Sequence, residues 1–128
     1  MGSRLRVPDV DDPDFVADVS TTSDGIELRL IGSADTAALT GFRTLLEKLH
    51  VELLGKQVRE IVVDMQATDL IAAPCFNELV NWVQRLQELP PEQRYRIRMR
   101  SNPTIAWQKH GLQALSCFDT DIIIIEIP

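Results

Sequence analysis

The stretch REIVVDMQATDLIAAPCFNELVNWV (59–83) decides the fold, because a strand pattern gives way there to a helix pattern. Its opening REIVVDM (59–65) is a short apolar run of β-branched residues, typical of a strand buried on both faces. Pro74 suits the first turn of a helix, where its missing N–H costs nothing. Apolar residues then recur at three- and four-residue steps: Phe76, Leu79, Val80, Val83 and Leu86. The stretch therefore predicts the strand-to-helix corner of an α/β protein.

Strand and helix patterns alternate on both sides of this corner. Asp35 is a candidate helix N-cap and Gly55 a helix stop, while Asp24-Gly25 predicts a hairpin turn. Helices between strands imply crossover connections, so we expect a mixed sheet with an antiparallel N-terminal hairpin followed by β-α-β-α-β. The predicted strands are 15–19, 26–30, 59–65, 95–100 and 121–127, and the predicted helices are about 35–55, 74–89 and 103–115.

Composition and charge limit the classes of partner. The chain has 128 residues, 45% hydrophobic and 25% charged, with a net charge of −6 and a pI near 4.8. This balance disfavours nucleic acid and anionic membrane surfaces as partners, and no apolar run reaches the ~20 residues needed for membrane insertion. We expect residues 1–12 to form a flexible acidic arm and residues 13–128 a single domain. With no signal-peptide pattern and no CxxC pair, the sequence predicts a reduced, cytoplasmic protein without disulfide, metal or cofactor.

Four arginines alternate along the strand predicted over 95–100. Arg94, Arg96, Arg98 and Arg100 fall on one face, which helices could not cover at an acceptable desolvation cost. We therefore expect the helices to lie mainly on the other face of the sheet. The row could be a solvated face that neighbours such as Glu27 neutralise, or it could receive an acidic protein surface, including the acidic arm. Nucleic acid is the least favoured of the three interpretations.

The element order resembles the STAS domain family, which includes the anti-sigma-factor antagonists of bacterial partner-switching systems. The resemblance covers roughly residues 15–127 and rests on Gly32-Ser33-Ala34-Asp35 before the first helix, and on Asp64-Met65 before the corner and CFNELVNWV. It implies a STAS-like sheet and a non-catalytic interaction domain in a bacterial cytoplasm. The implied partner is a kinase-like anti-sigma factor or a similar regulatory protein. A second implied role is docking on the ATPase of an ABC transporter.

The corner departs from the family pattern. In STAS domains of this type the second helix opens with an Asp-Ser-Ser-Gly-Leu type motif, whose serine or threonine accepts a phosphate. Such a site suits an anion, since backbone N–H groups and the helix dipole favour negative charge. Here the matching positions, Ala73 and Pro74, have no hydroxyl, and Thr68 is the nearest substitute acceptor. We expect a docking corner without the usual phospho-switch, made of Asp69, Ala72, Ala73, Pro74 and Cys75.

An enzyme is the alternative from a different class. A thiol in the first turn of a helix, as Cys75 would be, can have a lowered pKa and act as a nucleophile. Such a nucleophile needs a base, and nothing in the sequence places His50 or His110 beside it. Packing is therefore the favoured role of Cys75, and also of Cys117. No phosphate-binding, zinc-protease or serine-hydrolase motif is present, so no catalytic residue is predicted.

Three further expectations follow from single residues and short runs. Asp64 is expected to brace the turn after its strand rather than to bind metal. Trp82 and Trp107 could anchor a partner, although half-buried core is at least as good an interpretation for Trp82. The apolar run 122–125 should be paired inside the sheet or covered by a neighbouring chain, since an exposed edge of this kind invites aggregation. The sequence leaves homo-oligomerisation open.

Overall fold

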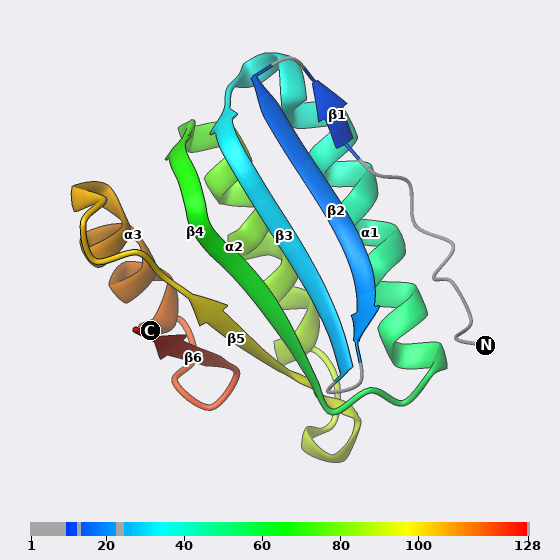
Figure 1. Ribbon diagram of the computed structural model, residues 1–128. Coiled ribbons are helices and arrows are strands. Elements are labelled where there is room, and N and C mark those ends of the chain that lie inside the picture. Colours follow the sequence, from blue (N-terminus) through cyan, green and yellow to red (C-terminus); the bar gives the residue numbers. More distant parts are fainter. Residues whose placement is uncertain (1–9, 13, 23–24, 128) are drawn as a thin grey trace.

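Six strands form one sheet in the computed structural model, which describes residues 10–12, 14–22 and 25–127 (Figure 1). The strands lie side by side in chain order, from β1 to β6. The elements are β1 (Val10–Asp12), β2 (Phe15–Thr22), β3 (Gly25–Ala34), the 3-10 helix η1 (Thr36–Ala38), α1 (Leu39–Gly55), β4 (Glu60–Ile71), α2 (Ala73–Gln87), the 3-10 helix η2 (Pro91–Gln93), β5 (Arg96–Arg100), α3 (Ala106–Ser116) and β6 (Ile123–Glu126).

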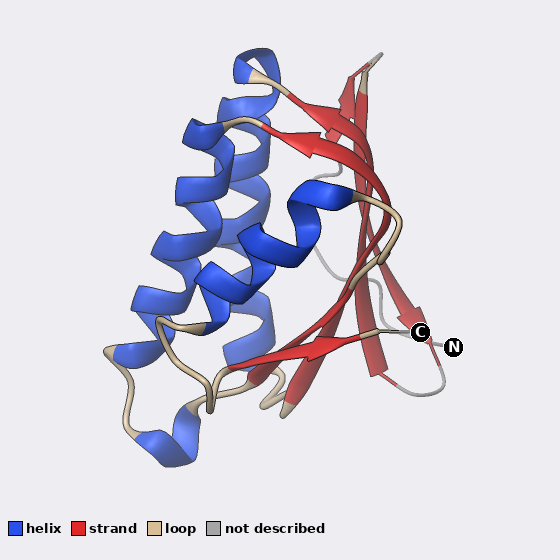
Figure 2. Ribbon diagram, turned by 90° about the vertical axis from the view of Figure 1, so that its left-hand side faces the viewer, coloured by secondary structure: helices blue, strands red, loops and turns tan. Residues whose placement is uncertain are grey.

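The α-helices cover one face of this sheet. β1–β2 and β2–β3 pair antiparallel, and the pairs from β3 to β6 are parallel, each joined through one of α1, α2 and α3. Right-handed crossovers to strands that are added in one direction place successive helices on the same face. Figure 2 shows this arrangement, with helices on one side of the sheet. The predicted mixed sheet and one-sided helix layer are therefore confirmed.

The core lies between the sheet and α1 and α2. Alternate residues of β3 and β4 point into it, as the strand period requires: Leu28, Leu30, Ile61, Val63 and Met65. The apolar face of α1 packs on them with Phe42, Leu45, Leu46, Leu49 and Leu53. Trp82 is buried in this core, with its indole Nε1 donating to the Tyr95 hydroxyl at 2.5 Å. The same hydroxyl lies 2.6 Å from Nδ1 of His50. The core interpretation of Trp82 is thus confirmed.

Part of the predicted acidic arm is a strand. Residues 10–12, which we placed in the arm, form β1 and pair with β2 from Val10–Ala17 to Asp12–Phe15. This pairing satisfies main-chain groups along part of the outer edge of β2. Residues 1–9, the rest of the predicted arm, lie outside the described residues, as do Asp24 of the predicted turn and residues 13, 23 and 128. The hairpin itself is confirmed by the antiparallel pairing of Thr22 with Gly25.

β3 and β4 both run well past their predicted ends. Their parallel pairing continues through two register shifts to Ala34 and Ile71. Gly32 enables this path, because its φ of +94° suits glycine and an added Cβ would collide with the main-chain oxygen of Asp14. The loop predicted after Met65 is therefore strand, and a single residue, Ala72, separates β4 from α2.

The start of α3 also differs from the prediction. The helix begins at Ala106, three residues after its predicted start, and Ala106 is exposed. Asn102, just ahead of the predicted helix, accepts with its side-chain oxygen from the main-chain N–H of Thr104 at 3.0 Å. This contact closes a local turn ahead of the helix, as asparagine side chains often do.

The apolar run 122–125 lies at the sheet edge, which contradicts the first of its two predicted alternatives, pairing inside the sheet. The second alternative, cover by a neighbouring chain, stays a prediction. Among the strands that the structure describes, β6 is the last in the order and pairs only with β5. Its helix side is nevertheless covered, because Ile122 and Ile123 are buried and Ile125 packs against the core. The strand is therefore half covered, with its outer edge open in the described part of the chain.

Candidate functional site

The corner between β4 and α2 places a helix N-terminus at the end of the sheet. Ala72 is the N-cap, with an extended backbone (φ −64°, ψ 151°) and no side-chain capping bond. Its N–H donates to the carbonyl of Ala34 at 2.8 Å, and its carbonyl accepts from Phe76 at 2.9 Å. Ala72 thus joins β3, β4 and α2 through its main chain, and the first turn of α2 lacks the side-chain cap that an aspartate or serine would supply.

The structure brings the five predicted corner residues together at this point, at different depths. Asp69, Ala73 and Pro74 are exposed, and Ala72 is half-buried. Cys75 is completely buried beneath them. The outer surface of the corner is therefore small and uncharged around Ala73 and Pro74, with the Asp69 carboxylate nearby.

Cys75 packs in the hydrophobic core. Its thiol donates to the main-chain carbonyl of Asp35 at 3.3 Å. Burial raises the pKa of the Cys75 thiol, and the nearby carboxylates of Asp35 and Glu78 raise it further. A buried thiol with a raised pKa is a poor nucleophile. The proposed base, His50, is held instead by Tyr95 toward the other end of α1, roughly 16 Å along the helix from its first residue.

Thr68, the predicted substitute acceptor, is also buried. Its side chain is 0% exposed, and its hydroxyl donates to the carbonyl of Leu30 at 2.6 Å. A kinase could reach this hydroxyl only if the end of β4 separated from β3. The burial of Thr68 therefore argues against its phosphorylation.

Sequence reasoning missed the residue that holds the end of β4 in place. Gln108 of α3 is fully buried, and its amide nitrogen donates to Met65 O at 2.7 Å and to Thr68 O at 2.9 Å. Its amide oxygen accepts from the N–H of Asn102 at 2.8 Å. β5 ends opposite Asp64, so these side-chain bonds replace a strand partner that β4 lacks from this point onward.

Two further side chains from the α3 region, those of Trp107 and Asn102, also hold the end of β4, and together with Gln108 they form what we call the clamp. The indole Nε1 of Trp107 donates to Asp69 O at 2.6 Å, and the Asn102 amide donates to Gln66 O at 2.9 Å. A signal for the clamp was present in the sequence. Gln108 sits on the apolar stripe of its helix, in step with Leu112 and Leu115, and a polar residue there needs a buried partner.

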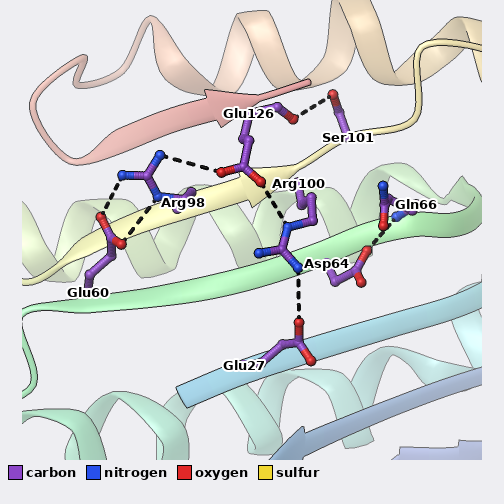
Figure 3. A network of polar contacts seen from close by, with 8 residues as sticks. All are labelled: Glu27, Glu60, Asp64, Gln66, Arg98, Arg100, Ser101 and Glu126. Atoms are coloured by element: carbon purple, nitrogen blue, oxygen red, sulfur yellow. Dashed lines mark hydrogen bonds and ion pairs between the residues drawn. The ribbon is translucent and has the colours of Figure 1, made fainter. Parts of the chain in front are cut away.

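The arginine row lies on the open face of the sheet, where acidic side chains neutralise Arg98 and Arg100. Arg98 makes a bidentate contact to Glu60, at 3.2 and 3.1 Å. Arg100 donates to Glu126 at 2.9 Å and to Glu27 at 3.3 Å (Figure 3). The predicted neutralisation by Glu27 is thus confirmed.

Arg94, the first member of the predicted row, has a different role. It precedes β5, and its guanidinium donates to the carbonyls of Gln87 and Leu89, both at 2.9 Å. Cationic side chains suit this position, since the last carbonyls of a helix lack intrahelical partners. Arg94 therefore anchors the end of α2 and leaves the row to Arg96, Arg98 and Arg100.

Two other expectations can be placed on the structure. The Asp64 carboxylate accepts from the main-chain N–H of Gln66 at 3.0 Å. Asp64 therefore braces the backbone as predicted, but within β4 rather than in a turn after it. Among the described residues, no group of histidine, cysteine and carboxylate side chains is arranged to hold a metal ion. In that same part of the chain, every helix is too short or too polar to cross a bilayer.

No family model and no curated protein matches the chain. Solved structures do match it. An anti-sigma factor antagonist from Mycobacterium paratuberculosis is similar over 88% of each chain, with a TM-score of 0.62 and 11% sequence identity. An anti-sigma-factor antagonist STAS domain from Rhodobacter sphaeroides matches 70% of this chain and 88% of its own, with a TM-score of 0.45 and 13% identity. The first likeness shows that the chain has the fold of an anti-sigma-factor antagonist, which is the STAS-like fold that the sequence predicted.

Proposed function

We propose that the chain is a non-catalytic regulatory domain that binds a partner protein at the corner between β4 and α2, without the usual serine or threonine phospho-switch. The observation that carries the proposal is the exposed, hydroxyl-free first turn of α2 at Ala73 and Pro74, on the fold of an anti-sigma-factor antagonist. By that likeness the partner is a kinase-like anti-sigma factor or a similar regulatory protein in a bacterial cytoplasm.

The chemistry of the corner supports constant rather than switched binding. Phosphorylation would add about two negative charges at a helix N-terminus and change which partner can dock. Ala73 and Pro74 offer no oxygen to modify, and the Thr68 hydroxyl is buried and already bonded to Leu30 O. The corner therefore stays in one charge state, and Pro74 limits the freedom of the first helical turn.

The same geometry disfavours thiol chemistry. Cys75 lies beneath the surface, with a raised pKa and its proton directed at the Asp35 carbonyl. A substrate would have to displace Ala73 and Pro74 to reach the sulfur. The thiol therefore supports the corner from below.

The test is the variant Ala73→Asp, which adds charge and bulk to the exposed first turn. An aspartate near a helix N-terminus is locally favourable, so the fold should be unaffected. The partner is first captured from a lysate of the native host, purified and titrated by calorimetry. Ala73→Asp should weaken binding about tenfold or more, which corresponds to about 1.4 kcal/mol.

Ala114→Asp is the matched control, because Ala114 is also an exposed helical alanine but lies in a different helix, near the C-terminal end of α3. It should bind as the parent does. If Ala73→Asp binds the purified partner as tightly as the parent, the corner is not the docking surface. Capture of a transporter ATPase, with the same loss in Ala73→Asp, would keep the corner and change the class of partner.

A second measurement tests whether the chain lacks a phosphorylation switch. Incubating the parent with ATP and its captured partner should leave the chain free of phosphate and the affinity unchanged. Ala73→Ser restores a hydroxyl at the exposed position, so a partner with kinase activity should phosphorylate this variant only. Phosphate on Thr68 of the folded parent would contradict the proposal.

A further inference from the structure

The outer edge of β6 carries main-chain groups directed away from the sheet. Ile97 donates to Ile122 O at 2.8 Å and Ser101 donates to Glu126 O at 2.9 Å, so the even-numbered residues of β6 face β5. A residue's N–H and C=O point to the same side of a strand, which directs those of Ile125 outward. The outward N–H of Ile123 already has a partner, the Asp119 carbonyl at 3.0 Å. Figure 2 shows this edge from the side, with α3 beside it.

An apolar groove lies beside the same edge, between β6 and α3. It has a volume of about 590 Å³, and its lining includes Ile125 and Ile127 together with Gln113 and Ser116 of α3. Ile127 follows the strand directly and lies at the rim of the groove. Its side chain is 68% exposed, and a large apolar side chain exposed beside an apolar groove marks a candidate contact surface. Edge and groove together offer both main-chain bonds and apolar contact to an added strand.

We propose that a second copy of this chain occupies this edge, with β6 pairing antiparallel to β6 of the partner copy about a two-fold axis at Ile125. In this register, Ile125 faces Ile125 of the other copy and the two exchange both main-chain hydrogen bonds. Ile123 faces Ile127 of the other copy, whose N–H can donate to the Ile123 carbonyl. The two sheets become one continuous sheet, and the interface is isologous, as two-fold symmetry requires.

The side chains favour this register over its neighbours. On the helix side, Ile127 of one copy lies against Ile123 of the other, at the Ser116 end of the groove, which covers its exposed surface. On the open side, Glu126 faces Ile124 of the other copy. Moving the axis to Glu126 would place two like charges directly opposite, which is destabilising. Moving it to Ile124 would leave Ile127 without a facing residue in the strand.

The pattern also favours a second copy over an unrelated strand. A strand added at this edge would contact the groove with every second side chain, so those side chains should be apolar. Ile123, Ile125 and Ile127 of a second copy meet this requirement. A pairing of this length forms about four main-chain bonds and falls below the ~1,600 Å² of a standard interface, so the dimer should be weak, on the order of micromolar. Each copy has a net charge of −6. Added salt should therefore strengthen the dimer by screening repulsion.

The first test is sedimentation velocity of the intact chain from about 1 to 500 μM, a range that spans micromolar dissociation constants. The parent should shift from monomer to dimer, and more so at higher salt. Ile127→Asp should weaken the dimer about tenfold or more. Val51→Asp is the matched control, because Val51 is 67% exposed but lies on α1, and this variant should dimerise as the parent does. A parent that stays monomeric throughout, or an Ile127→Asp variant that dimerises like the parent, would overturn the proposal.

A cysteine at the axis tests the register. Facing residues of a hydrogen-bonded antiparallel pair have Cα atoms about 5.5 Å apart, within the range of a disulfide. In a Cys117→Ser background, which removes the exposed native thiol, Ile125→Cys should form a disulfide dimer under mild oxidation, whereas Val51→Cys should not. Equal cross-linking at both positions would contradict the register. The proposal is independent of the corner, so Ala73→Asp should leave dimerisation unchanged.

Discussion

Replacing Gln108 with leucine should destabilise the chain by about 2–4 kcal/mol, since the change removes three hydrogen bonds and leaves buried main-chain groups without partners. The amide of Gln108 serves the carbonyls of Met65 and Thr68 and the N–H of Asn102, at distances of 2.7 to 2.9 Å. Each stranded buried group costs about 1–3 kcal/mol. Asn102 is half-buried and can regain a water bond, so the two carbonyls dominate the loss, which the apolar leucine offsets in part.

Urea unfolding followed by tryptophan fluorescence measures this loss. The midpoint should fall while the m-value stays constant, because the folded surface area is unchanged. Gln84→Leu is the matched control, since Gln84 is exposed on α2 and its replacement should stay within about 0.5 kcal/mol of the parent. A Gln108→Leu variant within about 0.5 kcal/mol of the parent would show that the end of β4 is held by other contacts.

Gln108→Glu sharpens the test through pH. An ionised carboxylate in the buried site would face the carbonyls of Met65 and Thr68, whereas a protonated one could still donate to one of them. The pKa of this glutamate should therefore be raised above its unfolded value of about 4.3. The folded state then binds more protons than the unfolded state, so stability falls as pH rises from the unfolded pKa toward the folded one. The deficit of Gln108→Glu should be smallest near pH 4 and largest near neutral pH, while that of Gln108→Leu stays constant.

Two further predictions concern the buried polar groups. Burial lowers the pKa of His50 below 6.5, and Arg85 lowers it further, so the unfolded state binds more protons in this range and stability should fall as pH drops from about 7.5 to about 5.5. His50→Gln should reduce that pH dependence in urea unfolding, and an unchanged slope would exclude His50 as its source. In the native protein, a thiol-reactive probe should label Cys117 quickly and Cys75 only on unfolding, because Cys117 is exposed and Cys75 is buried with a raised pKa. Fast labelling that persists in Cys117→Ser would instead reveal an activated Cys75.

The order of strands and helices could be predicted from the sequence because it depends on local periodicity. Alternation marked β3 and β5, and the three- and four-residue steps marked α1 and α2. The length of β4 could not be predicted in this way. Its second half, QATDLI (66–71), has no regular alternation, because β4 carries one extra residue relative to β3 at each of two register shifts while the two strands stay paired to Ala34 and Ile71. Such bulges interrupt the two-residue alternation by which a strand is recognised in a sequence.

The candidate site was predictable in position but not in depth. Pro74 and the strand-to-helix change located the corner, and the residue types at positions 73 and 74 showed directly that neither has a side-chain hydroxyl. Packing was the favoured role of Cys75, but the sequence did not reveal that Thr68 points inward, because its depth follows from a bond to Leu30, more than thirty residues earlier in the chain. Such long-range contacts are set by tertiary packing, which local patterns do not encode.

The open face of the sheet bears on which surfaces are left for partners. Opposing residues alternate in sign across five strands, from Asp18 to Arg29, Asp64, Arg100 and Glu126. Arg29 and Arg100 each lie between two carboxylates along this cross-strand line, so these charges are balanced within the sheet. A polyanion would have to displace these carboxylates before it gained a new contact, and the net charge of −6 opposes its approach. The corner at Ala73 and the outer edge of β6 require no such exchange. The corner presents the uncharged residues Ala73 and Pro74, and the β6 edge presents outward main-chain groups beside an apolar groove, which is why we place the proposed contacts there rather than on the arginine row.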